Sequence, residues 1–306
     1  MVVRRQTNLS YIPPPYIYVI ESIKQYGNPM GTPPEDRVKP PLKIPKKAYT
    51  LYYAGCTASL RYKRIVEATT KILAKIGCKF TMLGANEVCC GYPLRAIGLD
   101  EGFREIASTN AEMFHKAGIK KVITTCPGCL TTLGRDYEET IGGVPFEVMH
   151  ITEVIVEAIK EGKLHFKNEM RMKAAYHDPC HLGRYCEVYD PPRKIAVTIP
   201  GLTCVEMGRW CRDAAWCCGG PIRTAFSNLA TAMSKNIILE AKTLNVDSIL
   251  TTCPTCLHSL SMNAPRYGLK VYDLTELTAA AMGLGKLEKG RRYSRARLLS
   301  QTRTSN

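Results

Sequence analysis

The sequence contains the segment Val122-Ile123-Thr124-Thr125-Cys126-Pro127-Gly128-Cys129-Leu130 and repeats it as Ile249-Leu250-Thr251-Thr252-Cys253-Pro254-Thr255-Cys256-Leu257. In both copies a short apolar run, typical of a buried strand, ends directly before a cysteine. The Cys-Pro-x-Cys that follows predicts the first turn of a helix, where a three-residue spacing puts both sulfurs on one face. The helix dipole favours thiolates there, so each copy predicts a pair of reactive thiols at the end of a strand.

A second repeated motif precedes each copy: Cys89-Cys90-Gly91-Tyr92-Pro93-Leu94-Arg95 matches Cys217-Cys218-Gly219-Gly220-Pro221-Ile222-Arg223. One further cysteine stands before each vicinal pair, with 32 intervening residues in the first half and 36 in the second. After the pairs, 35 and 34 residues lead to Cys-Pro-x-Cys. Ten of the fourteen cysteines thus form two matched sets of five. The first set is Cys56, Cys89, Cys90, Cys126 and Cys129, and the second set is Cys180, Cys217, Cys218, Cys253 and Cys256.

Alternating strand and helix signals surround these motifs. Strands are predicted at residues 48–53, 79–83, 121–125 and 146–150, with helices at 60–76, 101–117 and 151–160. The second half repeats this order, with strands at 174–177, 202–207 and 248–252 and a helix at 229–245. The pattern predicts an α/β fold of two tandemly duplicated, Rossmann-like parallel-sheet domains related by pseudo-twofold symmetry. Because ligands gather at the carboxyl ends of parallel strands, each half is expected to collect its five thiolates at one edge of its sheet.

Four segments are predicted along the chain: an arm at 1–48, a first domain at 49–171, a second domain at 172–285 and a basic tail at 286–306. The arm is rich in proline and is expected to be extended, apart from a short helix around residues 17–24, and to lie on another surface.

Composition narrows the class of protein. The formal net charge is +15, and part of the excess lies in the tail. No nucleic-acid-binding motif accompanies it, so nucleic acid is not an expected partner, and a solvated tail or one wrapped on a partner protein is preferred. The absence of a secretory signal and of a run of about 18 apolar residues predicts a cytoplasmic protein, with peripheral attachment at the inner face of the membrane left open. In a reducing compartment such cysteines are metal ligands or redox centres rather than disulfides.

Three chemistries suit these cysteines. Zinc is common at Cys-x-x-Cys, but four ligands satisfy it and neighbouring cysteines rarely bind one zinc together. Thiol redox chemistry explains neither the vicinal pair nor the duplication. A polynuclear iron–sulfur centre can use a vicinal pair, because adjacent thiolates can cap different irons or bridge two of them, and ligation by thiolates alone favours iron–sulfur chemistry. The residues favour iron–sulfur chemistry, with a structural zinc protein as the alternative.

From about Tyr49 to Tyr272 the doubled pattern resembles the cysteine-rich CCG domain of the heterodisulfide reductase family, as found in its B-type subunits and in the catalytic part of its D-type subunits. The resemblance implies two noncubane 4Fe-4S clusters, one per domain, held by the ten cysteines of the two sets. It also implies that the clusters face a shared cavity, in which a disulfide is reductively cleaved between them.

The arm segment Tyr26-Gly27-Asn28-Pro29-Met30-Gly31, with Arg37 behind it, resembles the segment that joins a ferredoxin domain to the CCG domains in the D-type proteins. The sequence contains no ferredoxin-type C-x2-C-x2-C-x3-C-P run. The resemblance therefore implies that electrons come from a separate ferredoxin-like iron–sulfur subunit of the C type. A flavin-bearing protein of the A type is implied as a further partner.

The leading hypothesis is an enzyme: the catalytic subunit of a heterodisulfide reductase or a related complex that cleaves or forms a disulfide. An archaeal cofactor disulfide and a sulfur-oxidation substrate on a lipoate-binding carrier are both open. The competing hypothesis is a non-catalytic electron-transfer or quinone-side CCG subunit of a dehydrogenase complex. Two complete cysteine sets favour catalysis.

Residues beside the two sets carry further expectations. His177 and His181 flank Cys180 and are candidates to donate hydrogen bonds to cluster sulfur or to protonate a leaving thiolate, with a packing or solvent-facing role as the alternative. Arg95 and Arg223 are equivalent and are candidates to bind an anionic substrate group or to tune the clusters, with a loop-holding ion pair as the alternative. The cysteines outside the sets are Cys78 and Cys204, expected to be small core residues, and Cys186 and Cys211, candidates to lie near the second cluster.

Overall fold

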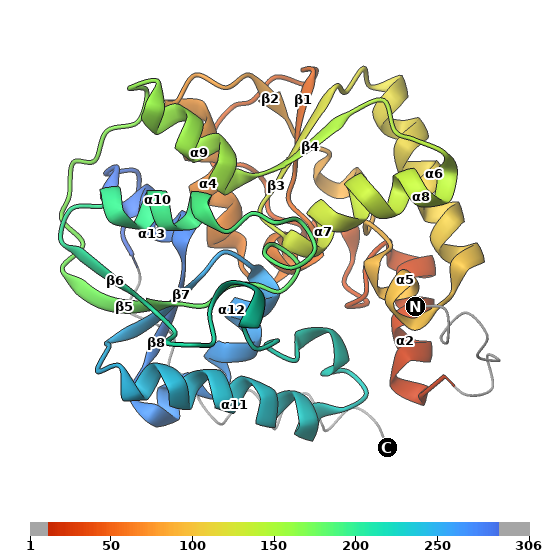
Figure 1. The fold of residues 1–306 in the computed structure, drawn as a ribbon. Helices are drawn as coiled ribbons and strands as arrows, with labels where there is room; N and C mark the ends of the chain where they lie inside the picture. Colours follow the sequence, from red (N-terminus) through yellow and green to blue (C-terminus); the bar gives the residue numbers. More distant parts are fainter. Residues whose placement is uncertain (1–11, 288–306) are drawn as a thin grey trace.

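The computed structural model describes residues 12–287, which form two α/β halves (Figure 1). Each half has one sheet of four strands, and every strand pair is parallel. The strand order is β2-β1-β3-β4 in the first half and β6-β5-β7-β8 in the second. Because the second order is the first one repeated strand by strand, the predicted pair of duplicated parallel-sheet units is confirmed.

The first half follows the predicted alternation closely. Its strands are β1 (Thr50–Tyr53), β2 (Phe80–Thr81), β3 (Lys121–Thr124) and β4 (Glu147–His150). Its helices are α3 (Cys56–Leu60), α4 (Lys63–Lys75), α5 (Tyr92–Ile97), α6 (Asp100–Lys116), α7 (Pro127–Thr131), α8 (Tyr137–Ile141) and α9 (Ile151–Lys160), with a 3-10 turn η3 (Gly84–Asn86) and a π-helical turn η4 (Thr132–Asp136).

The second half has the same plan. Its strands are β5 (Met172–Tyr176), β6 (Leu202–Glu206), β7 (Ser248–Thr251) and β8 (Lys270–Asp273). Its helices are α10 (Asp190–Thr198), α11 (Ser227–Thr243), α12 (Pro254–Ser261) and α13 (Leu274–Ala281), with 3-10 turns η5 (Arg212–Ala214), η6 (Gly220–Ile222) and η7 (Ala264–Tyr267).

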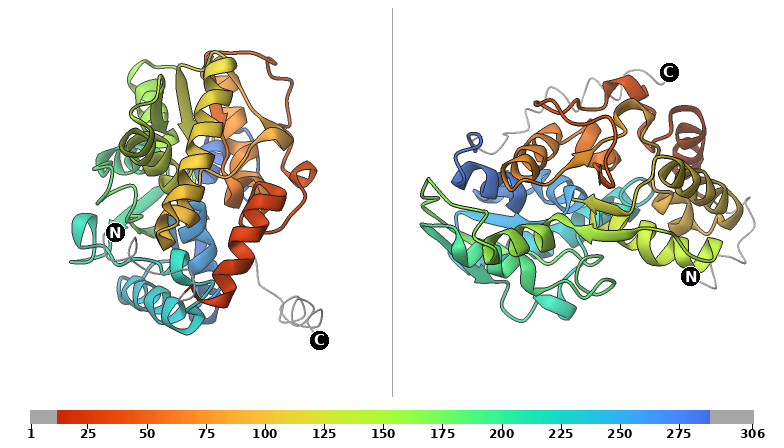
Figure 2. Two further views of the ribbon diagram at one scale, coloured as in Figure 1. Left: turned by 90° about the vertical axis from the view of Figure 1, so that its right-hand side faces the viewer. Right: turned by 90° about the horizontal axis from the view of Figure 1, so that it is seen from above.

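Helices are paired across the boundary between the halves. Helix α4 of the first half packs on α13 of the second, and α10 of the second packs on α9 of the first. Helices α4 and α10 follow the first strand of their half, and α9 and α13 follow the last, so the two contacts are equivalent under a pseudo-twofold axis. Side chains such as Ile65, Ile155, Ile195 and Leu277 belong to one buried cluster there. In both views of Figure 2 the two halves adjoin. The predicted domain boundaries stay predictions.

The first sheet buries both of its faces. Along β1, Tyr52 points into the core shared with the second half, whereas Leu51 and Tyr53 point into a second apolar cluster. This alternation is the two-residue period of a strand. Helix α6 covers the second cluster with Phe103 and Phe114, both fully buried.

The arm is less extended than predicted, because it forms a helix, α2 (Pro14–Tyr26), and a 3-10 turn, η2 (Pro34–Asp36). The surface that it covers belongs to this same chain. Val19 and Ile23 of α2 lie in the second apolar cluster, and the Cys89 amide donates to the Gly27 carbonyl at 2.7 Å. An amphipathic face thus docks the arm beside the first cysteine set.

The helix predicted at 60–76 is α4, which begins later, at Lys63, because Tyr62 before it adopts a non-helical conformation (φ −118°, ψ 53°). The tail predicted at 286–306 lies outside the described residues, apart from its first two. No helix within residues 12–287 is both long enough and apolar enough to cross a membrane.

Buried side chains cap the last helix of each half at equivalent positions, His150 before α9 and Asp273 before α13. The Thr275 amide donates to Asp273 Oδ1 at 2.8 Å, whereas Oδ2 is buried with no hydrogen-bond partner among the described residues. Burial raises the pKa of Asp273 to about 7.

This raised pKa predicts how stability depends on pH. An unfolded aspartate loses its proton near pH 4, whereas folded Asp273 keeps it until about pH 7, so the folded state binds more protons in that window and the free energy of unfolding falls as pH rises through it. Asp273→Asn keeps the capping oxygen without ionising. We expect its stability relative to the natural chain to increase from pH 4 to pH 8, by at most about 4 kcal/mol. Urea unfolding of both proteins from pH 4 to pH 8 measures this change. A stability difference between them that stays constant with pH would contradict the expectation.

Candidate functional site

The cysteines lie where the strands of both sheets end. Cys126 follows β3 after one residue, Cys253 follows β7 after one residue, and Cys56 begins α3 directly after the β1 turn. Cys126 and Cys253 are the residues that precede the first turns of α7 and α12, as the Cys-Pro-x-Cys pattern predicts. In α12 the Cys256 amide donates to Cys253 Sγ at 3.4 Å, which is the anion-favouring geometry of a helix N-terminus.

Within each set the thiols contact one another in the same order. In the first half, hydrogen bonds join Cys56 to Cys89, Cys90 to Cys89 and to Cys129, and Cys129 to Cys126. In the second half, the corresponding chain runs Cys180, Cys217, Cys218, Cys256, Cys253, with 3.9 Å between the first two sulfurs. The duplication therefore extends to the contacts between side chains.

These contacts shift the thiol pKa values in opposite directions. Hydrogen bonds from Cys129 and Cys89 lower the pKa of Cys90, and those from Cys180 and Cys218 lower the pKa of Cys217. The pKa of Cys56 is raised, first by its hydrogen bond with Cys89 and then by burial. Each set thus stabilises a thiolate within its vicinal pair.

Both sets line one cavity of about 840 Å³ between the halves. All ten cysteines contribute to its wall, in agreement with the shared cavity expected from the sequence. The wall also contains Arg61, Arg184 and Arg223 and contains no aspartate or glutamate from the described residues. The arm supplies apolar side chains such as Val19 and Met30. The cavity is therefore thiol-rich, positively charged and partly apolar.

The vicinal pairs depend on glycines in the left-handed conformation. Gly91 has φ 87° and Gly219 has φ 74°, a region of backbone conformation that favours glycine. Buried side chains hold the carbonyls of these loops: Tyr137 donates to the Cys90 carbonyl at 3.1 Å, and Ser259 donates to the Cys218 carbonyl at 2.5 Å.

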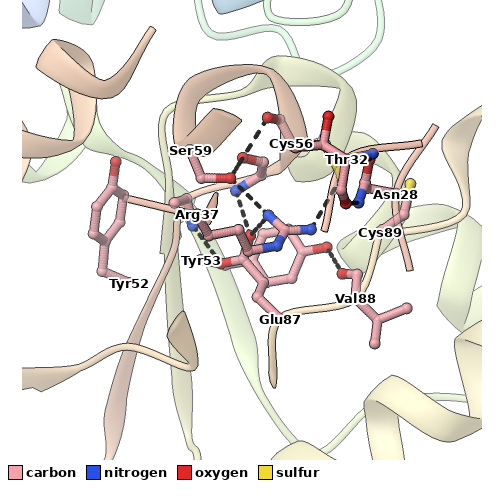
Figure 3. Close-up of polar contacts among 12 residues, drawn as sticks. Asn28, Thr32, Arg37, Tyr52, Tyr53, Cys56, Ser59, Glu87, Val88 and Cys89 are labelled. Atoms are coloured by element: carbon pink, nitrogen blue, oxygen red, sulfur yellow. Dashed lines mark hydrogen bonds and ion pairs between the residues drawn. The ribbon is translucent and has the colours of Figure 1, made fainter. Parts of the chain in front are cut away.

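A buried ion pair supports the first set (Figure 3). Arg37 of the arm donates to Glu87 at 2.9 Å, to Ser59 Oγ at 2.6 Å and to Cys56 Sγ at 3.5 Å. Glu87 also accepts from the amides of Ala54 and Gly55, at 2.9 and 3.0 Å. Burial raises the pKa of Glu87, while Arg37 and the two amides oppose that shift. The sequence analysis did not identify this pair as a site feature; the available signal was Glu87 two residues before a vicinal pair.

The two candidate histidines have different surroundings. His181 lines the cavity, and its ring nitrogens contact Tyr92 OH at 3.1 Å and Thr131 Oγ1 at 3.3 Å, both from the first half. His177 is buried outside the cavity wall, and its Nε2 has no hydrogen-bond partner among the described residues. Burial lowers the pKa of both to about 4. Their roles toward a cluster stay predictions.

The two equivalent arginines also differ. Arg223 lines the cavity and donates to Ser259 Oγ at 2.8 Å. Arg95 is buried outside the wall and pairs with Asp100 at 3.4 Å and Glu139 at 3.1 Å. These two ion pairs agree with the loop-holding alternative, and a role of Arg95 toward the substrate or the clusters stays a prediction.

The four cysteines outside the two sets do not line the cavity. Cys78 and Cys204 are half-buried against the shared apolar core, as predicted. Neither Cys186 nor Cys211 lines the cavity, and their expected position near the second set stays a prediction. Cys186 contacts Thr131 Oγ1 of the first half at 3.3 Å, so this contact joins the two halves. Both residues line a smaller cavity of about 470 Å³.

One cavity residue that the sequence analysis missed joins the halves. His258, two residues after Cys256, contacts Tyr62 OH at 3.0 Å and Arg61 Nη1 at 3.2 Å. Thr131 occupies the equivalent position in the first half. Its contact with Cys186 corresponds to the contact of His258 with Tyr62. The sequence signal for His258 was its position two residues after the second Cys-Pro-x-Cys motif.

The donor set fits iron–sulfur chemistry. Five thiols per half, one vicinal pair included, exceed what one zinc uses, and thiolates alone are the ligands of iron–sulfur clusters. Within residues 12–287 no group of three or more His, Cys, Asp or Glu side chains is arranged to hold a single metal ion. The fit of these residues to iron–sulfur clusters therefore rests on the number and type of their thiol donors.

Comparison with known proteins agrees with this donor set. The cysteine-rich (CCG) domain family matches residues 50–134 and again 174–261. The D subunit of the dihydromethanophenazine:CoB–CoM heterodisulfide reductase of Methanosarcina barkeri is 37% identical over 273 residues, which are 86% of this chain and 66% of that protein. The EtfAB:quinone oxidoreductase of Syntrophomonas wolfei is 33% identical over 76% of this chain and 34% of its own length.

Other similarities are more distant. The B subunit of the fumarate reductase (CoM/CoB) of Methanothermobacter marburgensis is 31% identical over 74% of this chain and 45% of its own length. Among solved structures, a hypothetical protein from Helicobacter pylori has a TM-score of 0.56 at 12% identity, covering 94% of this chain and 56% of that one, which indicates a shared fold alone. The chain spans two thirds or less of the length of these curated relatives.

Two glycines with the same φ test how tightly the second vicinal loop is packed. A Cβ on Gly219 (φ 74°) would lie 2.7 Å from the Ala230 backbone, whereas a Cβ on Gly268 (φ 74°) meets no atom within 4 Å. Gly268→Ala is expected to cost about 1–2 kcal/mol from the left-handed conformation alone. Gly219→Ala is expected to cost about 1–3 kcal/mol more, because the backbone of α11 must move. Equal losses of unfolding free energy in urea would show that the loop is not tightly packed.

Proposed function

Because the chain belongs to the cysteine-rich (CCG) domain family, we propose that it is the cluster-bearing catalytic subunit of a heterodisulfide reductase or a related complex. The observation that carries the proposal is the meeting of two matched five-thiol sets at one cavity. The relatives are oxidoreductase proteins, several of them subunits of reductases, which supports an iron–sulfur role. The proposed cofactors are two noncubane 4Fe-4S clusters, one held by each set.

The proposed reaction is a two-electron disulfide reduction. One disulfide, two electrons and two protons yield two thiols, and the reverse reaction forms the disulfide. The clusters, when bound, supply the electrons one at a time. The chain contributes the rest: the cavity holds the disulfide between the sets, and its apolar wall excludes water. The guanidinium groups stabilise the thiolates that form.

The charge of the cavity supports an anionic substrate. Arg61 and Arg184 contribute cationic groups to its wall, and His258, bonded to Arg61, fixes one of them. Carboxylate, sulfonate or phosphate groups beside the disulfide would pair with these cations. A lipoate-bound substrate on a carrier protein would instead match the apolar part of the wall, since its dithiolane is tethered through an apolar chain.

The second candidate function is a non-catalytic electron-transfer subunit that acts next to a quinone. The similarity to an EtfAB:quinone oxidoreductase and the apolar side chains of the arm at the cavity favour it. Rapid cluster reoxidation by a quinone analogue, with no turnover of any disulfide, would support this alternative.

The proposed partners follow from the source of electrons. A ferredoxin-like iron–sulfur protein of the C type would deliver them, and a flavin-bearing protein of the A type would complete the complex. Copurification from an anaerobic extract tests both, whereas recovery of the chain from that extract with neither protein attached would contradict them.

Metal analysis tests the cofactors. Anaerobically purified protein is expected to contain about eight irons and about eight acid-labile sulfides per chain, with EPR signals on partial reduction. Cys90→Ser and Cys218→Ser are each expected to lose about half of the iron, whereas Cys211→Ser, outside both sets, retains it all. About two zincs without iron would contradict the clusters, and full iron in either of the first two variants would contradict the five-ligand assignment.

Substrate preference tests the charged wall. With a chemical electron donor, Arg61→Gln is expected to raise KM about 2- to 5-fold for the disulfide of 2-mercaptoethanesulfonate, because one exposed ion pair contributes up to about 1 kcal/mol. The KM for the uncharged disulfide of 2-mercaptoethanol serves as the control and is expected to be unchanged. Equal effects on both substrates would contradict recognition of charge.

A further inference from the structure

The duplicated site is unequal at Arg37, because this residue precedes the duplicated part of the chain. Its side chain is only 2% exposed, and its guanidinium donates to Cys56 Sγ at 3.5 Å (Figure 3). No arginine or lysine of residues 12–287 makes a comparable contact with a thiol of the second set, whose sulfurs accept from amides and from one another. Among the described residues, the first set thus has a buried cation hydrogen-bonded to one of its sulfurs, whereas Arg223 acts on Cys218 only through its charge.

The surroundings of Arg37 fix it in place. Glu87 pairs with one nitrogen of the guanidinium and is itself held by the amides of Ala54 and Gly55. Ser59 accepts from Arg37 and donates to the Gly55 carbonyl at 2.7 Å. The cation is therefore tied to the turn that carries Cys56 and cannot turn towards solvent without breaking these bonds.

The equivalent positions of the second half carry no such groups. Counting from the matching cysteines, Glu87 corresponds to Ala215 and Ser59 to Gly183. The nearest candidate cation is Arg223, but its nitrogens donate to Thr231, to the Ala230 carbonyl and to Ser259, not to a sulfur. The difference between the halves lies in the residues themselves.

We propose that Arg37 raises the reduction potential of the first cluster above that of the second, so that an electron resides preferentially at the first. This rests on the proposed function. A cation in a low-dielectric site stabilises added negative charge, and reduction adds one electron to the thiolate-ligated centre. Glu87 acts in the opposite direction, and its hydrogen bonds are with Arg37 and two amides rather than with the sulfur. Arg37 is a positioning and tuning residue, since it acts through Cys56.

The test is a redox titration of the holoprotein followed by EPR. Arg37→Gln is expected to lower one of the two reduction potentials by about 59 mV or more. For one electron this corresponds to a tenfold or larger change in the equilibrium constant of reduction. Arg37→Lys retains the charge and restores most of the shift. Glu87→Gln shifts the same potential upwards. Loosening of the fold would not produce opposite signs, so the pair separates an electrostatic role from a structural one.

Arg95→Gln is the matched control, because Arg95 is about as buried as Arg37 and is also paired, but its ion pairs are with carboxylates and it has no hydrogen bond to a cysteine sulfur of the described residues; no shift is expected. If Arg37→Gln does not fold, Glu87→Gln carries the test alone. Unchanged potentials, or shifts of the same sign in Arg37→Gln and Glu87→Gln, overturn the inference. If the iron content is intact in that case, the proposed function still stands. Absence of iron from the natural chain overturns both.

Discussion

The structure depends on one geometric constraint: two parallel sheets meet so that the carboxyl ends of their strands face a common cavity. The paired helix contacts of α4 with α13 and of α9 with α10 fix that meeting, because they bury one continuous core between the halves. Strand ends are where a parallel sheet leaves polar loops free to bind ligands. The same constraint brings two sets of five thiols within reach of one substrate.

Repetition made most of this predictable from the sequence. Apolar runs ending at Cys126 and Cys253 indicated strands, and the matched spacing indicated equivalent sites. Repetition could not predict what differs between the halves. Arg95 and Arg223 occupy the same position in the motif, but Asp100 binds the first, whereas Asn228 stands at that place in the second half.

The arm was the least predictable part, since it has no second copy for comparison. Its prolines suggested an extended segment, whereas the apolar face of α2 docks it on the first half. The contact of Arg37 with Glu87 joins residues 50 positions apart, which no local pattern encodes. A duplicated fold thus supplies two similar centres, and a unique segment makes them different.

The central claim is that both cysteine sets hold an iron–sulfur cluster facing the same cavity. Crystals of the anaerobically purified protein, measured on both sides of the iron absorption edge, test it most directly. We predict two groups of anomalous peaks, one within each five-cysteine set and both on the cavity wall. Peaks at the zinc edge alone, or iron at a single set, would contradict the account.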